Sequence, residues 1–344
     1  MKLGGIWKKI LLVLIVILFV WVVFAFAPRP VATEDNPFRR EEDGPPHIIA
    51  HAGGNMEFPD NTLEAYYNTY SIDPDAIFET DVALTEDGVV VLTHDLTFDR
   101  KTNITEAPVE ETRYEDLMED EVGFGYENPI DDEGFNTTGE FHEYETYDGR
   151  HVTPLDVDYP DGVEPRHEEI FRATTLKELI THFPENYLIV ELKQGGEQGL
   201  ELLDAIIELM EDLDDEYDTF ERINLASFHR DMTDAFTELR DTEYPDLMFS
   251  PQHDSIEKFY ALHLPRLTFF YRDEVTSFQV PMEEGGFDLA TDAFVNAAQR
   301  HNIAVHYWTI NDEDDMRELV ELGADGILTD RPTLLNEVIE DYYD

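Results

Sequence analysis

Polar and apolar positions after residue 46 alternate between short β-rich runs and amphipathic helical segments. Eight runs are rich in β-branched and aromatic residues and are bounded by turn-forming residues, which is typical of strands. These runs are His47–His51, Ile77–Val82, Tyr187–Leu192, Asn224–Phe228, Leu247–Ser250, Phe278–Val280, Ile303–Thr309 and Gly326–Thr329. The alternation predicts a parallel sheet built from βα units, and the number of strands predicts a TIM-type (β/α)8 barrel.

Between the strands, apolar residues recur at the three- and four-residue spacing of a helix. The clearest case is Gly199–Asp214, in which five apolar side chains share one face: Leu203, Ile206, Ile207, Met210 and Leu213. Other predicted helices are Leu63–Tyr70, Leu176–His182, Asp231–Leu239, Ala290–Arg300, Glu313–Leu322 and a last one from Thr333. Such one-sided helices are expected to cover the outside of the barrel.

After the predicted strand Ile77–Val82 the chain turns back on itself as a second short strand, and no helix follows directly. An Asp-Gly turn and the apolar run Val89–Leu92 predict an antiparallel hairpin. Glu79 and Asp81 are two residues apart, so both project from the same face of the strand, and the return brings His94 back toward them. Two carboxylates and an imidazole indicate a candidate site, whereas the carboxylate pair alone would equally suit a solvated acidic edge.

The alternation is interrupted between Thr102 and Arg172, where the chain is rich in Gly, Asp, Glu and Tyr and has weak periodicity. A structureless loop of that length is uncommon inside a compact domain, so an inserted subdomain or lid is predicted at about residues 103–171, after the second strand region. Insertions that follow barrel strands lie at the carboxyl-terminal face, beside the active site.

The N-terminus predicts a membrane anchor. Residues 1–9 carry three lysines, and residues 10–27 are apolar and uncharged. At about 1.5 Å per residue, this run is roughly 27 Å long, close to the thickness of a bilayer core. The basic flank predicts that residues 1–9 are cytoplasmic and that the folded domain lies outside the cytoplasm, on a single-pass protein of the cell membrane. Because Ala25-Phe26-Ala27 resembles a signal-peptidase site, a cleaved signal peptide is the alternative.

Residues 28–46 combine proline with mixed charge and lack periodicity, which predicts a linker between the anchor and a folded domain at residues 47–344.

The net charge limits the kinds of molecule that the protein is expected to bind. The chain has 78 acidic and 23 basic residues and a net charge of -55. Such a surface repels nucleic acid, so no nucleic-acid partner is expected. The aromatic content of 12% argues against disorder, so the acidity indicates adaptation to a saline exterior. The absence of cysteine excludes disulfides and thiol chemistry, and the oligomeric state is left open.

Further polar motifs fall at strand ends or just before helices. They are His51-Ala52-Gly53, Pro59-Asp60-Asn61-Thr62, Glu191-Leu192-Lys193, Trp308-Thr309-Ile310-Asn311 and the segment from Gly323 to Pro332. Together with the hairpin, and in this order, they resemble the motifs of the glycerophosphodiester phosphodiesterase family. That pattern runs H-R-G, P-E-N-T, E-x-D-V, T-x-D-G, H-D, E-x-K, W-T-[IV]-N and G-x-D-G-[IL]-x-T-D-x-P. The match spans nearly all of residues 47–332.

The resemblance implies an α/β barrel with an insertion after the second strand region. It implies an enzyme that hydrolyses glycerophosphodiesters, as small molecules or polymers, to glycerol 3-phosphate and an alcohol. It also implies that Glu79, Asp81 and Glu191 bind a divalent cation, and three carboxylates suit Ca²⁺ or Mg²⁺. His51 and His94 match the family's acid/base pair. The nucleophile is either the glycerol 2-hydroxyl or water.

Four residues are expected near the substrate. Lys193 would lie by the phosphate, Trp308 would form an apolar wall, and Asp60 replaces the glutamate of P-E-N-T. The family arginine that contacts phosphate is Ala52 here, and we expect Arg100 to replace it in part. Lys101 and Lys193 are the other available replacements for this arginine.

Two other functional classes remain as alternatives to the phosphodiesterase. Because of Ala52, the protein could be a catalytically weak, membrane-tethered binding protein for glycerol-phosphate compounds. A barrel glycosidase would use Glu191 with Glu79 or Asp81 as its two carboxylates. Retention of both histidines and all three carboxylates favours the phosphodiesterase, since a binding protein has no chemical use for an acid/base pair.

The acidic surface gives a testable prediction. Salt screens the global negative field that repels an anionic substrate, so phosphodiesterase activity should rise as salt is increased toward molar concentration. Initial rates on glycerophosphocholine over a salt series measure this effect. A steady fall in rate from low salt upward would contradict the saline adaptation.

Overall fold

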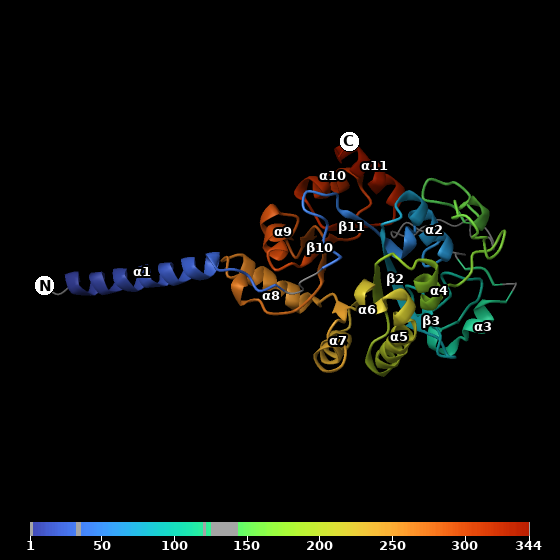
Figure 1. The fold of residues 1–344 in the computed structure, drawn as a ribbon, viewed down its shortest axis with the longest axis horizontal. Helices are drawn as coiled ribbons and strands as arrows, with labels where there is room; N and C mark the ends of the chain where they lie inside the picture. The colour runs from blue at the N-terminus through green and yellow to red at the C-terminus, as the bar shows by residue number, and fades with distance from the viewer. Residues whose placement is uncertain (1–2, 32–35, 120–121, 125–143, 344) are drawn as a thin grey trace.

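The computed structural model describes residues 3–31, 36–119, 122–124 and 144–343. Its centre is a nearly closed barrel of eight parallel strands (Figure 1). Their order is β6 (Met248–Phe249), β5 (Ile223–Ala226), β4 (Leu188–Leu192), β2 (Ile77–Leu84), β1 (His47–Ala50), β11 (Gly326–Thr329), β10 (Ala304–Tyr307) and β7 (Ser277–Val280). All eight predicted strands are present, and the TIM-type barrel is confirmed.

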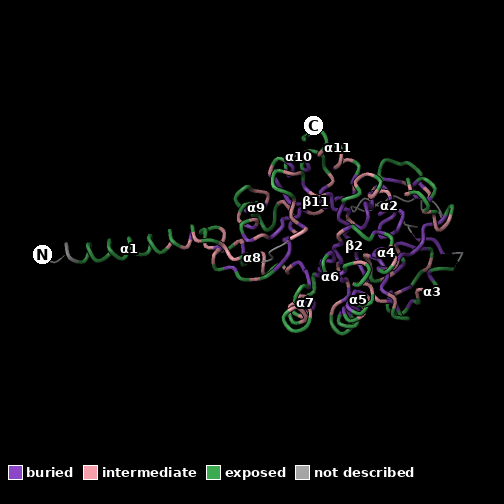
Figure 2. The backbone as a smooth tube through the Cα atoms, viewed as in Figure 1, coloured by how far each residue is buried: buried purple, intermediate pink, exposed green. Residues whose placement is uncertain are grey.

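Helices surround this barrel and bury their apolar faces against the outer side of the strands (Figure 2). They are α2 (Leu63–Ile72), α4 (Leu176–His182), α5 (Gly196–Tyr217), α6 (Thr219–Arg222), α7 (Arg230–Thr242), α8 (His253–His263), α9 (Asp292–Gln299), α10 (Glu313–Leu322) and α11 (Pro332–Tyr343). Helix α8 is not among the predicted helices, because Phe259 is its only buried residue, which leaves too narrow an apolar stripe to recognise. A short ribbon, β8 (Glu283–Glu284) with β9 (Phe287–Asp288), follows β7.

The first strand ends one residue earlier than predicted. His51 starts the 3-10 turn η1 (His51–Gly53), in which Ala52 has a φ of 48°. Gly53 is required at its position because a Cβ there would lie 2.7 Å from the Cβ of Ala65. This turn directs the chain across the carboxyl end of the barrel.

The barrel is closed by few contacts between β6 and β7, which share no backbone ladder. The Thr276 amide donates to the Phe249 carbonyl at 3.2 Å. Inside the barrel, the hydroxyl oxygens of Ser250 and Ser277 are 2.9 Å apart, and Asn224 donates to Ser250 at 2.8 Å. Polar side chains therefore replace the missing main-chain bonds along this seam.

The predicted hairpin is also present. β3 (Val90–Leu92) pairs antiparallel with β2. A small apolar cluster beneath it includes Phe98 and residues of the segment that follows, in which η2 (Val109–Glu111), α3 (Tyr114–Leu117) and η3 (Pro154–Asp156) are the helical turns. The predicted insertion falls between β3 and α4. Its residues 120–121 and 125–143 lie outside the described part of the chain.

The N-terminal helix α1 (Leu3–Phe26) projects away from the barrel, and its apolar side chains are largely exposed (Figures 1 and 2). Its stretch Ile6–Phe26 is long and apolar enough to cross a membrane. From Asn36 onward, the segment predicted as a linker packs on the amino-terminal end of the barrel. Asn36 donates to the carbonyls of Thr276 and Asn302 at 2.7 and 2.8 Å.

Phe38 closes the amino-terminal end of the barrel. It is fully buried and packs with the inward-facing Ile49 and Ile189 and with Tyr187. The ring of His306 lies beside it, and His306 Nε2 is 2.9 Å from the Phe38 carbonyl oxygen, which can only accept. A residue that precedes the first strand thus completes the inner core.

Buried His306 makes stability depend on pH. Burial lowers the pKa of His306 to about 4, whereas an unfolded histidine titrates near 6.5. Between these values the unfolded chain binds a proton that the folded chain does not, so the free energy of unfolding should fall as the pH is lowered from about 6.5 to 4, by up to about 3 kcal/mol for this group. Denaturant unfolding at pH 7 and pH 5 measures the fall. His306→Gln, which keeps a donor for Phe38, should reduce it, and an equal fall in the variant would refute the assignment.

Candidate active site

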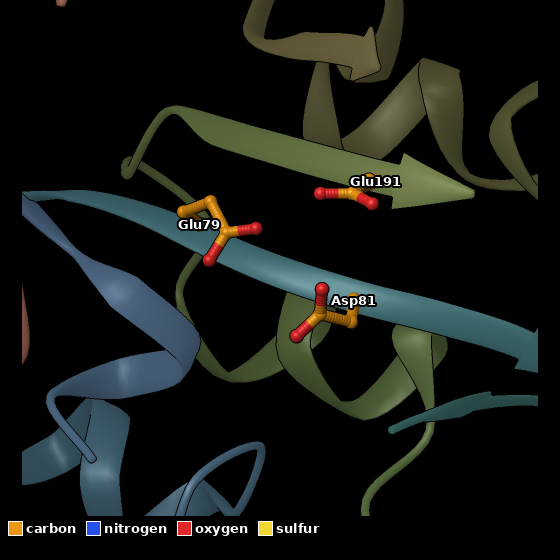
Figure 3. Close-up of side chains that lie close together, drawn as sticks. All are labelled: Glu79, Asp81 and Glu191. Carbon is orange, nitrogen blue, oxygen red and sulfur yellow. The ribbon is translucent and has the colours of Figure 1, made fainter. Parts of the chain in front are cut away.

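Three carboxylates meet at the carboxyl ends of β2 and β4. Asp81 and Glu191 are register partners in this parallel pair, and Glu79 lies two residues before Asp81 on the same face. One ligand atom from each side chain lies within 4.8 Å of the others, and the three groups face one another across the two strands (Figure 3). The predicted trio is therefore assembled in one place.

The trio concentrates negative charge in a site with little solvent. Burial, together with the Asp81 carboxylate, raises the pKa of Glu79 to about 8 and also raises the pKa of Glu191. Burial opposes ionisation of Asp81, but the Lys193 ammonium, together with His94, His51 and the hydrogen bond from Asn61, outweighs burial and lowers the pKa of Asp81. Lys193 Nζ lies 2.8 Å from Glu191 Oε1 and 3.3 Å from Asp81 Oδ1.

This donor set fits a hard divalent cation. Carboxylate oxygens are the ligands that Ca²⁺ and Mg²⁺ prefer, and the mutual repulsion of three buried carboxylates is relieved by positive charge. The trio is also held in position. The Ala52 amide donates to Glu79 Oε2 at 2.9 Å, and Asn61 Nδ2 donates to Asp81 Oδ2 at 3.1 Å.

His51 is oriented by a carboxylate from the opposite end of the chain. Ala50 and Thr329 are register partners, so the residues that follow them, His51 and Asp330, lie side by side. His51 Nδ1 is 2.6 Å from Asp330 Oδ1, and Asn311 donates to Asp330 Oδ2 at 2.6 Å. Burial opposes protonation of His51, but the Asp330 carboxylate outweighs it and raises the pKa of His51 to about 10.

A carboxylate, that of Asp95, also orients His94. Its Nδ1 is 2.9 Å from Asp95 Oδ1, and Arg100 Nε donates to Asp95 Oδ2 at 2.5 Å. The hydrogen bond to Asp95 raises the pKa of His94. The hairpin brings His94 to the trio as predicted, since the Thr93 amide donates to the Asp81 carbonyl at 2.9 Å.

Asp60 contacts two basic side chains that follow the hairpin, those of Lys101 and Arg100. It forms a buried ion pair with Lys101, and Arg100 Nη2 is 3.5 Å from Asp60 Oδ2. Lys101 is only 2% exposed, so it is committed to Asp60 and does not face the substrate side. Arg100 is partly exposed, yet both of its contacts described above are to carboxylates.

Trp308 follows β10 at the same end of the barrel. Its ring packs edge-on against Phe228, with centroids 6.2 Å apart, and Phe228 is 73% exposed although it is a large apolar residue. The pair forms an apolar edge at the carboxyl-terminal face of the barrel.

Several residues of this site have no role predicted from the sequence. They are Asn61, Asp95, Phe228, Asn311 and Asp330. Asn61, Asp95, Asn311 and Asp330 stand next to a predicted residue or inside a quoted motif, and Phe228 ends a predicted strand, so position at or after a strand end was the available signal. Nothing in the sequence indicated which side chain each would contact.

An α/β barrel that gathers three carboxylates, a lysine and two histidines at the carboxyl ends of its strands has the architecture of a barrel enzyme. The sequence profile of the Glycerophosphoryl diester phosphodiesterase family matches residues 51–334. The chain therefore belongs to this family, and the resemblance inferred from its motifs is confirmed.

Individual relatives agree with this assignment. The chain is 25% identical over 298 residues to a glycerophosphodiester phosphodiesterase of Caldanaerobacter subterraneus subsp. tengcongensis, covering 85% of this chain and 97% of the relative. It is 24% identical over 311 residues to a lysophospholipase D of Mus musculus, covering 86% and 82%.

Solved structures share the fold. A glycerophosphoryl diester phosphodiesterase from Parabacteroides distasonis superposes with a TM-score of 0.57 at 18% identity, covering 89% of this chain and 90% of that chain. A phosphodiesterase of Oleispira antarctica in complex with the product sn-glycerol-3-phosphate has a TM-score of 0.56 at 18% identity, covering 86% and 97%.

The contact between His51 and Asp330 can be tested directly. Asp330→Asn removes the charge that favours the imidazolium, so the pKa of His51 should fall by more than about one unit. Histidine NMR titration of chelator-treated protein measures this shift. A misoriented imidazole should also reduce kcat/KM by on the order of 10²-fold or more. Asp204→Asn removes the same charge from an exposed position on α5 and should change neither quantity. An unchanged His51 pKa in Asp330→Asn would refute the role.

Proposed function

We propose that the protein hydrolyses glycerophosphodiesters to glycerol 3-phosphate and an alcohol, with His51 and His94 as the acid/base pair and with a bound divalent cation. The observation that carries this proposal is the convergence of the carboxylate trio with two carboxylate-supported histidines at one end of a barrel of this family. The solved relative that holds sn-glycerol-3-phosphate supports the class of product.

Glu79, Asp81 and Glu191 would hold the cation, Ca²⁺ or Mg²⁺. When bound, such a cation supplies positive charge that neutralises phosphate oxygens and an attacking oxygen. Lys193, which contacts Glu191 and Asp81, adds a further positive charge beside the phosphate.

The two histidines are suited to proton transfer because each has its Nδ1 engaged by a carboxylate. Nε2 of each ring is then the atom that exchanges a proton with the substrate. One histidine protonates the leaving alkoxide, and the other accepts the proton of the nucleophile. If water attacks the phosphorus, glycerol 3-phosphate forms directly. If the glycerol 2-hydroxyl attacks, a cyclic phosphate forms first and water then opens it to glycerol 3-phosphate. Asp330 favours the protonated form of His51, so we assign proton donation to His51.

The remaining roles concern the ends of the substrate. Arg100 would provide part of the positive charge that the family arginine supplies where this chain has Ala52, while it also fixes Asp95 behind His94. Asp60 holds Arg100 and Lys101 in place. Trp308, with Phe228, would offer an apolar wall to the glycerol or to the alcohol group.

The alternatives have less support. A glycosidase has less support because the family profile that matches residues 51–334 is that of a phosphodiester hydrolase. A pure binding protein would not need two histidines that are each oriented by a carboxylate. The replacement of the family arginine by Ala52 is the one observation that favours weak catalysis.

We further propose that α1 is retained as a single-pass anchor of the cell membrane and that the barrel lies outside the cytoplasm. The support is the apolar stretch Ile6–Phe26 together with the lysines before and within its first turn. A signal sequence has a similar composition, so retention of α1 is part of the proposal.

Release of glycerol 3-phosphate from glycerophosphocholine tests the proposed reaction. Wild-type protein should require a divalent cation and lose activity in chelator. His51→Ala should lower kcat by about 10²- to 10⁴-fold while metal binding, measured by calorimetry, persists. Glu79→Ala should lose both activity and metal affinity.

Glu201→Ala, at an exposed position on α5, is the matched control and should leave both unchanged. Full activity of His51→Ala would refute the acid/base assignment. Metal binding without turnover of any glycerophosphodiester by the wild type would instead favour the binding protein.

A further inference from the structure

A cavity of about 460 Å³ lies where α1 meets the barrel, between the last turn of α1 and the helices α8 and α9. Ala25 and Phe26 of α1 form part of its apolar wall. Its polar wall contains Arg29, Arg266 and Arg300. None of its lining residues belongs to the candidate active site, and no role described above uses it.

The charge of this cavity is unusual for the chain. Only 23 residues are basic against 78 acidic ones, yet three arginines line this one cavity, against a single carboxylate, that of Asp292. Burial and the neighbouring Arg300 lower the pKa of Arg29, which shows that positive charges face one another here. An anion placed between them would relieve this repulsion.

The three arginines are not equivalent. Arg29 donates to the carbonyls of Phe24, Ala25 and Ala27 and so caps the end of α1. Arg266 and Arg300 are exposed, and within the described ranges neither forms an ion pair. Their guanidinium groups are therefore available to an anionic ligand.

The cavity lies at the depth expected of lipid headgroups. Ile6–Phe26 contains 21 residues, about 31 Å of helix, which matches a bilayer core. The final turns of this stretch contact the barrel at η4 (Thr268–Phe270): the indole of Trp21 donates to the Pro265 carbonyl at 2.8 Å, and the ring of Phe24 packs on Phe270 at 4.8 Å. Tryptophan is typical of the membrane–water boundary.

The surface next to this contact is apolar. Leu264 is 63% exposed and Phe270 is 46% exposed, and both belong to the segment that meets α1 beside α8 (Figure 1). Exposed apolar side chains that continue the surface of a membrane-spanning helix are suited to the headgroup and upper acyl region.

We propose that this cavity binds the phosphate group of an anionic bilayer lipid, with Arg266 and Arg300 contacting the phosphate and the acyl chains lying along α1. The proposal rests on α1 being retained as a membrane span, and it is independent of the proposed hydrolysis. The lipid would seat the barrel on the bilayer at one fixed place, which offsets the repulsion between an acidic domain and an anionic membrane surface.

Lipid binding by the full-length chain in neutral detergent tests the proposal. Native mass spectrometry follows titration with dioleoyl phosphatidylglycerol and, separately, with dioleoyl phosphatidylcholine. The wild type should bind phosphatidylglycerol at least about tenfold more tightly, because both headgroups carry a phosphate but the choline ammonium of phosphatidylcholine adds a positive charge that the three arginines repel. Arg266→Gln combined with Arg300→Gln should abolish this preference.

Arg113→Gln combined with Arg317→Gln is the matched control. It removes the same charge from two exposed arginines that pair with Glu115 and Glu313, and it should keep the preference for phosphatidylglycerol. Both double variants should hydrolyse glycerophosphocholine at the wild-type rate, which reports an intact barrel.

Four results would overturn the proposal. The first is equal binding of the two lipids by the wild type, and the second is equal loss in both double variants. The third is full displacement of phosphatidylglycerol by millimolar inorganic phosphate, which would assign the cavity to a soluble anion. A purified chain that begins after Ala27 would also overturn it, and would leave the proposed hydrolysis untouched.

Discussion

The parallel pairing of β2 with β4 is the constraint on which the site depends. Its register sets Asp81 opposite Glu191, and the two-residue period of a strand adds Glu79 to the same face. Three carboxylates so close together oppose folding unless cations neutralise them. Lys193, the residue that follows β4, contributes one such positive charge. If β4 were shifted by one residue against β2, Glu191 would point to the opposite face of the sheet and would no longer lie beside Glu79 and Asp81.

Closure of the barrel keeps that register. The sheet is weakest between β6 and β7, where serine and asparagine side chains bridge the strands. At the amino-terminal end, the Phe38 side chain fills the inside of the barrel although Phe38 belongs to none of the strands. Next to it, the Arg39 guanidinium pairs with Asp325. Phe38, which follows α1 in the chain, is thus part of the core.

Positive charge is scarce in this chain, and the buried cations have specific partners. Lys101 pairs with Asp60, Arg166 with Glu64, and Arg222 donates to main-chain carbonyls. Other exposed cations, such as Arg230 and Lys258, pair with carboxylates at the surface. Lys193 neutralises part of the carboxylate trio, and Arg266 and Arg300, at the junction with α1, form no ion pair within the described part of the chain.

The sequence by itself determined the strands, most helices, the hairpin and the shared face of Glu79 and Asp81, because these follow from side-chain periods of a few residues. It also determined the family, through the order of motifs. Only the tertiary structure placed Asp330, 279 residues away, against His51, committed Lys101 to Asp60 and put Phe38 inside the barrel. Such contacts depend on which strands become neighbours and in which register, and local periodicity carries no information about either.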